Sequence, residues 1–70
     1  MLRLKAERLA RGWSQLQLAA RARVHPSDVS RYENSHSILL GHRQRIAEAL
    51  EVPEERLEDV VRLKVVSENG

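Results

Sequence analysis

The sequence predicts an all-α fold, a compact bundle of five short helices, and three observations support this class. Apolar residues recur at three- and four-residue spacing, as an amphipathic helix requires. Serine, proline and glycine stand where helices start and stop, at Gly12, Ser14, Pro26 and Pro53. The length of 70 residues provides for one domain with a modest core. A chain this short usually needs disulfides, a metal, exceptional helix packing or a partner subunit.

The first three helices are expected in the first half of the sequence. The first ends at Gly12, which acts as a C-terminal stop. Ser14 is placed to cap a second helix over residues 14–21, and Pro26 is suited to the first turn of a third helix over residues 26–33. The residues that these helices are expected to bury or to carry on an apolar stripe are Leu2, Leu4, Ala6, Leu9, Ala10, Leu18, Ala19, Val24, Val29 and Tyr32.

The second half predicts a loop and two further helices. The loop covers residues 34–41 and is followed by a helix over residues 42–50, which buries Ile46, Ala47 and Leu50. Pro53 then opens a fifth helix with acidic residues in its first turn, where negative charge suits the helix dipole. Residues 62–67 are equally compatible with a continuation of this helix and with a short strand. One face of the fifth helix carries Leu57, Val60, Val61 and Val65.

Charge is distributed unevenly along the chain, although the net charge is only +2. Residues 1–45 contain nine Arg or Lys and three acidic residues, whereas residues 46–70 contain three Arg or Lys and seven acidic residues. The first part is therefore suited to a polyanion and the second is not. Ten of the twelve basic residues are Arg, whose planar fork suits phosphate groups and guanine edges. A compositional habit of the source would explain the preference for Arg equally well.

Composition also excludes or disfavours several classes of protein. The absence of Cys excludes disulfides and thiolate metal sites, and it suits a reducing cytoplasm, where we expect the protein to be located. No signal peptide or membrane span is recognisable. The histidines lie in different segments without convincing co-ligands, so neither a metal nor a cofactor is expected. The acidic cluster of residues 51–59 lacks a nucleophile or a paired base, so it is interpreted as a solvated helix face rather than an enzyme site.

The second and third helices, joined by a tight turn, have the build of a helix-turn-helix reader of duplex DNA. The third helix leaves Ser27, Asp28, Ser30 and Arg31 facing outward. A helix that only had to pack would more often carry Lys and Glu there, so this surface is expected to press against a partner. Asp28 would repel phosphates, and we interpret it as a cap of the helix start rather than as an acceptor from a cytosine amino group.

A longer pattern is carried by Leu4, Arg8, Gly12, Ser14, Gln15, Leu18, Ala19, Val24, Val29, Ser30, Arg31, Tyr32, Glu33, Asn34, Ile46, Ala47, Ala49, Leu50 and Val52. In identity and spacing it resembles the phage-repressor and Cro type of helix-turn-helix domain over roughly residues 4–57. The resemblance implies a lambda-repressor-like bundle of five helices, a two-fold dimer, and a third helix that lies in the major groove of DNA.

The resemblance also implies which side chains reach DNA. Base contacts fall on His25, Pro26, Ser27 and Arg31. Phosphate contacts fall on Ser14, Gln15, Ser30, Asn34 and His36. Arg31 is the strongest candidate for reading a base, because a bidentate Arg to guanine is the commonest specific contact. Arg8 and Glu33 match a family pair that joins the first helix to the end of the third, and the alternative is that both are solvated surface charges.

The chain departs from the family pattern at several positions. Arg23 stands in the turn where the family usually has Gly, and a side chain at positive φ carries a cost. Ser35 also replaces a usual Gly, and Arg43 replaces a frequent Leu. Trp13 stands where the family has Leu, so we interpret it as a core or helix-junction residue rather than as a platform for stacking bases.

These patterns together predict a non-enzymatic, sequence-specific double-stranded DNA-binding protein, a transcriptional repressor or regulator that binds an inverted repeat as a homodimer. Residues 1–61 would form the DNA-binding domain, and residues 62–70 a tail that could contribute to dimerisation. The expected dimer interface consists of Leu57, Val60, Val61 and Val65. The alternative is a protein-interaction module, such as an antitoxin or adaptor, in which the apolar residues 38–40 and the valine-rich end hold a partner chain.

Overall fold

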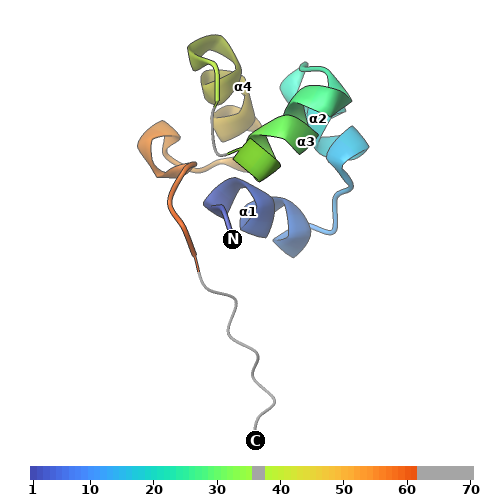
Figure 1. The fold of residues 1–70 in the computed structure, drawn as a ribbon. Coiled ribbons are helices and arrows are strands. Elements are labelled where there is room, and N and C mark those ends of the chain that lie inside the picture. Colours follow the sequence, from blue (N-terminus) through green and yellow to red (C-terminus); the bar gives the residue numbers. More distant parts are fainter. Residues whose placement is uncertain (36–37, 62–70) are drawn as a thin grey trace, which may run out of the picture.

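The computed structural model describes residues 1–35 and 38–61, which form four α-helices and one short 3₁₀ helix. The helices are α1 (Arg3–Ala10), α2 (Gln15–Ala22), α3 (Pro26–Ser35), α4 (Leu40–Leu50) and η1 (Glu54–Arg56). α2 packs against both α3 and α4, and α1 lies beneath α3 in the view of Figure 1. The all-α class is confirmed, whereas the expectation of five α-helices is wrong.

The junction between α1 and α2 follows the local signals of the sequence. Gly12 adopts a positive φ of 71°, a conformation that glycine reaches without a steric cost, just after α1 has ended. The Ser14 hydroxyl accepts a hydrogen bond from the Gln17 backbone N–H at 3.0 Å. The Gln17 side chain returns the contact by accepting from the Ser14 N–H at 2.8 Å. This reciprocal capping box satisfies two amide donors that a helix start would otherwise leave unpaired.

The turn between α2 and α3 contains an unusual backbone conformation. Arg23 ends α2 with φ 60° and ψ 43°, so the left-handed conformation forms although Gly is absent. Pro26 is the first residue of α3, as the sequence predicts. α3 then continues to Ser35, where the hydroxyl bonds to the Arg31 carbonyl oxygen at 2.7 Å. Because α4 already begins at Leu40, the predicted loop over residues 34–41 is too long at both ends.

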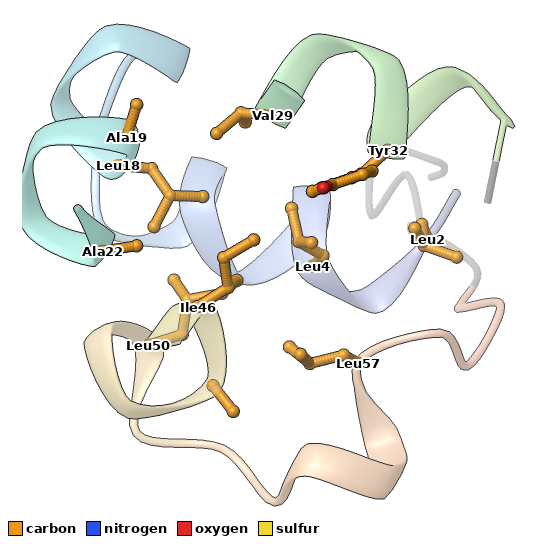
Figure 2. Close-up of a cluster of buried hydrophobic side chains, with 11 residues drawn as sticks. Leu2, Leu4, Leu18, Ala19, Ala22, Val29, Tyr32, Ile46, Leu50 and Leu57 are labelled. Carbon is orange, nitrogen blue, oxygen red and sulfur yellow. The ribbon is translucent and has the colours of Figure 1, made fainter. Parts of the chain in front are cut away.

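The core lies where the four α-helices and the segment after η1 meet. Figure 2 shows its side chains converging from the α-helices, with Leu57 entering from the segment after η1. The fully or almost fully buried apolar residues are Leu2, Leu4, Leu18, Ala19, Ala22, Val29, Tyr32, Ile46, Ala47, Leu50 and Leu57. Leu9 and Ala10, which the sequence placed on the apolar stripe of the first helix, are exposed instead.

The predicted fifth helix is replaced by η1 and by a segment that runs back along the N-terminus. Leu2 and Val60 form an antiparallel bridge, and the N–H groups of Arg3 and Leu4 donate to the carbonyl oxygens of Asp59 and Leu57 at 2.7 and 3.1 Å. These two N–H groups belong to the first turn of α1, which has no side-chain cap. The extended segment therefore supplies acceptors to the start of α1, which a continuing helix could not do.

This arrangement changes the roles of the residues assigned to a dimer face. Leu57 is 0% exposed and belongs to the core of its own domain, so its placement on an outer helical face is wrong. Val60 is 74% exposed, and Val61 is half-buried with its N–H bonded to the Met1 carbonyl oxygen at 2.7 Å. Val65 and the expected tail over residues 62–70 lie outside the described residues.

Candidate nucleic-acid interface

The outer face of α3 carries most of the residues expected to contact DNA. Val29, Tyr32 and Glu33 point into the protein and hold the helix in place. On the remaining surface, Ser27, Arg31 and Asn34 are exposed and follow one another at helical spacing. His25 is exposed just before the helix, whereas Pro26 and Ser30 are partly covered. His36 lies outside the described residues.

His25 caps the start of α3. Its ring Nδ1 accepts from the Ser27 backbone N–H at 3.1 Å and lies 2.7 Å from the Ser27 hydroxyl oxygen. The imidazole thus satisfies an amide donor that the helix start would leave unpaired. Asp28, which was expected to cap this helix, instead has its side chain bonded to other partners.

Asp28 pairs with the residue most strongly expected to read a base. Its Oδ1 accepts from Arg31 Nη2 one helical turn away, and its Oδ2 lies 3.9 Å from the Nδ1 of His42 on α4. The Asp28 side chain is 16% exposed while that of Arg31 is 65% exposed. The carboxylate therefore lies beneath the guanidinium, and the guanidinium extends outward from α3.

Tyr32 and His42 continue this cluster toward α4. The Tyr32 hydroxyl is hydrogen-bonded to His42 Nδ1, and the two ring centroids lie 5.8 Å apart at 52°. Burial raises the pKa of Tyr32 above its ordinary value of 10.0, and the negative charge of Asp28 acts in the same direction. The spacing of Asp28 and Arg31 was a detectable signal for their pairing. No sequence signal pointed to His42, because its contact with Tyr32 depends on how α3 and α4 pack.

A second cluster anchors the end of α3 to α1. Arg8 Nε and Nη2 donate to the two carboxylate oxygens of Glu33 at 2.6 and 3.0 Å, and both side chains are buried. Arg8 Nη1 also donates to the Trp13 carbonyl oxygen at 2.9 Å. Gln15 Nε2 donates to Glu33 Oε1 at 3.0 Å. The structure thus joins Arg8 and Glu33, and it places Gln15 at the edge of the same cluster.

Trp13 lies at the junction of α1 and α2. Its side chain is half-buried and packs against the core. The guanidinium carbons of Arg21 and Arg11 lie 4.4 and 5.8 Å from the ring centroid, distances at which a cation is attracted to an indole face. These contacts occupy the ring within the protein rather than leaving it as a platform for bases.

Two contacts outside α2 and α3 keep the domain closed. Arg43, in the position where the family often has Leu, donates from Nη2 to Glu58 Oε1 at 2.7 Å and so joins α4 to the segment after η1. Arg11 Nη2 donates to the carbonyl oxygen of Leu50 at the end of α4.

Within residues 1–35 and 38–61, His, Asp and Glu form no group of three or more that could hold a metal ion. In the same stretch, no helix combines the length and apolar character needed to cross a membrane.

Comparison with protein families identifies one match. A family model described as helix-turn-helix matches residues 4–57 of the chain, from the second residue of α1 to the buried Leu57 that follows η1. Comparison with curated proteins and with solved structures finds no match.

Proposed function

The chain belongs to the phage-repressor and Cro type of helix-turn-helix domain, a family of DNA-binding regulators, and from this we propose that it reads a specific double-stranded DNA sequence with α3. The observation that most supports this proposal is the exposed Arg31 on the outer face of a well-anchored α3. Its neighbours Val29, Tyr32 and Glu33 are buried, and Asp28 holds its guanidinium from below. An outward-facing guanidinium of this kind suits the two acceptors on a guanine edge.

Within this proposal, the residues around α3 divide into two groups. Base contacts are assigned to His25, Pro26, Ser27 and Arg31. Phosphate contacts are assigned to Ser14, Gln15, Ser30, Asn34 and His36. Gln15 can act in this way while bonded to Glu33, because its amide group carries two donor hydrogens and only one is used.

Substitution of Arg31 and Gln15 separates the two groups. Arg31→Ala should lose about 1–3 kcal/mol of discrimination at one position of the binding site, because one base loses its bidentate partner. Gln15→Ala should weaken binding to every sequence alike, because a phosphate contact carries no base information. The measurement is affinity for a duplex selected from a random pool, compared with affinity for random duplexes.

The exposed Arg56 of η1 supplies a matched control, since Arg56→Ala removes one positive charge away from α3. Equal losses on selected and random duplexes for Arg31→Ala would overturn its assignment to a base. If the unmodified protein shows no salt-dependent affinity for any duplex, the protein-interaction module becomes the better interpretation.

The proposed regulator acts as a homodimer on an inverted repeat, and repression is the proposed outcome. A two-fold axis would place two copies of α3 about 34–36 Å apart, one turn of duplex DNA. The exposed apolar side chain of Val60, at 74% exposure, supports a self-association surface at the C-terminal half. An inverted repeat protected from nuclease digestion over two half-sites would support this arrangement.

A further inference from the structure

A basic hollow of about 440 Å³ lies between the end of α2 and the outer side of α4. The hollow is lined by Arg21, Ala22, Arg23, Arg45, Glu48 and Ala49. Three of these side chains carry a positive charge and one carries a negative charge, and all four charged side chains are exposed. The small side chains of the two alanines leave space between the charged groups.

A hydrogen bond and a cation–π contact involve the arginines of this hollow. Arg45 Nη1 donates to the carbonyl oxygen of Arg23 at 3.4 Å, so α4 contacts the turn that ends α2. The Arg21 guanidinium carbon lies 4.4 Å from the centroid of the Trp13 ring, which limits how far that side chain can turn away. An anion in the hollow would be attracted by the three positively charged side chains that line it.

Arg23 contributes its charge at a conformational cost. Its φ of 60° lies in the left-handed region, which glycine adopts without the steric penalty of a Cβ atom. The described residues contain one other non-glycine residue at positive φ, Glu51, which ends α4 outside this hollow. A strained residue at a charged hollow is an observation from which function can be inferred.

We propose that this hollow binds a phosphate group of the DNA backbone, as a further phosphate site beyond those assigned to Ser14, Gln15, Ser30, Asn34 and His36. The inference rests on the proposed function, because it requires α3 to lie in the major groove. Arg23 is three residues before Pro26, so the hollow lies within about 11 Å of the start of α3 along the chain.

The length of α2 separates the hollow from the phosphate contacts proposed at Ser14 and Gln15. α2 has 8 residues and is therefore about 12 Å long, with Ser14 at one end and Arg23 at the other. The major groove is also about 12 Å wide. An α2 that lies across the groove, with Ser14 and Gln15 at the phosphates of one strand, would therefore bring the hollow at its far end to those of the other strand.

The salt dependence of DNA binding tests this site. Each phosphate contact contributes about 0.9 to the slope of log affinity against log salt concentration. Arg23→Gly and Arg45→Ala should therefore each reduce the slope by about that amount and weaken affinity several-fold, with the base preference unchanged. Glu48→Gln should strengthen binding, because it removes the carboxylate from the hollow, and Arg23→Lys should retain most of the slope.

Two matched controls separate charge from backbone strain. Arg23→Gly and Glu51→Gly both relieve a positive φ, so both should raise the melting temperature. Reduced DNA affinity is expected for Arg23→Gly alone. Arg56→Ala, which removes an exposed positive charge elsewhere, should leave the slope unchanged.

The outcomes distinguish this inference from the proposed function. If the unmodified protein lacks salt-dependent DNA binding, the proposed function fails. If it binds DNA but Arg23→Gly and Arg45→Ala keep the original slope, the phosphate site is overturned. A third experiment titrates the protein with inorganic phosphate and follows the NMR chemical shifts of the residues that line the hollow. If these chemical shifts change while the variants keep the original salt dependence of DNA binding, the hollow binds a free anion, and the proposal is overturned.

Discussion

Arg8 and Glu33 show how single side chains fix the position of the recognition surface. The carboxylate accepts two hydrogen bonds from one guanidinium and a third from Gln15, and the same guanidinium reaches the Trp13 carbonyl. A buried charge of this kind is tolerated because its partners satisfy it. α1, the start of α2 and the end of α3 therefore share one cluster. The position of α3, and with it that of Arg31, therefore depends on the buried pair of Arg8 and Glu33.

Removal of either Arg8 or Glu33 alone should destabilise the folded protein. Arg8→Ala or Glu33→Ala is expected to lower the free energy of unfolding by about 3–5 kcal/mol, because the remaining charge stays buried without its partner. Replacing both residues together, as in Arg8→Met with Glu33→Leu, should cost less than the sum of the single changes. Chemical denaturation measures each variant, with Lys5→Ala on the same helix as control. Single variants no less stable than Lys5→Ala would show that the pair is solvated.

At the scale of elements, α3 and α4 are joined through Tyr32 and His42. The phenol bonds to the imidazole, and Asp28 of α3 faces the same imidazole at 3.9 Å. Burial holds the pKa of Tyr32 above 10.0 in the folded protein. The unfolded chain therefore loses this phenolic proton at lower pH than the folded protein does. Stability must then fall as pH rises above about 10, since the folded state retains a proton that the unfolded state releases.

The alkaline titration of Tyr32 can be observed directly, because it is the one tyrosine of the chain. We expect the tyrosinate absorbance to appear with a midpoint above 10.0 in the folded protein and near 10.0 in denaturant. Tyr32→Phe should be less stable at neutral pH, because it loses the bond to His42, but its stability should decline less steeply at alkaline pH. The same midpoint in both states would contradict the burial of the phenol.

At the scale of the whole molecule, the two ends of the domain are paired. Met1 and Val61 exchange backbone hydrogen bonds of 2.7 Å, and Leu2 and Val60 form a bridge beside them. This pairing turns Leu57 inward and leaves the side chain of Val60 exposed. Leu57 and Val60, which a helical pattern placed on one face, therefore have different roles. Leu57 stabilises the fold, whereas Val60 belongs to the proposed association surface.

Two substitutions should separate these purposes. Leu57→Ala is expected to destabilise the fold by about 2–5 kcal/mol, as loss of a fully buried leucine does, without weakening association of the protein that remains folded. Val60→Asp should leave the melting temperature of the monomer nearly unchanged and weaken the proposed homodimer, because it places a charge on the exposed apolar surface. Sedimentation at several protein concentrations checks both. A full-length monomer at all of them would refute the dimer.

Local physical chemistry allowed the sequence alone to determine the helical class and the starts of α2 and α3. The Ser14 cap, the proline at the start of α3 and the glycine after α1 act within a few residues of where they stand. The spacing of α2 and α3 likewise sufficed to predict the helix-turn-helix and the exposed position of Arg31. The Asp28–Arg31 pair lies one turn apart on a single helix, so the sequence contained that signal as well, although Asp28 was interpreted as a cap.

Only the tertiary structure decided how the ends of the chain and the polar clusters are arranged. After Pro53, the apolar spacing suited a fifth helix, yet the first-turn amides of α1 needed acceptors, and residues 57–59 supply them. The contacts of Tyr32 with His42 and of Arg43 with Glu58 join elements that meet only when the bundle closes. The basic hollow arises in the same way, from arginines on α2, its terminal turn and α4. A sequence pattern describes one element at a time, whereas these features depend on the packing of several.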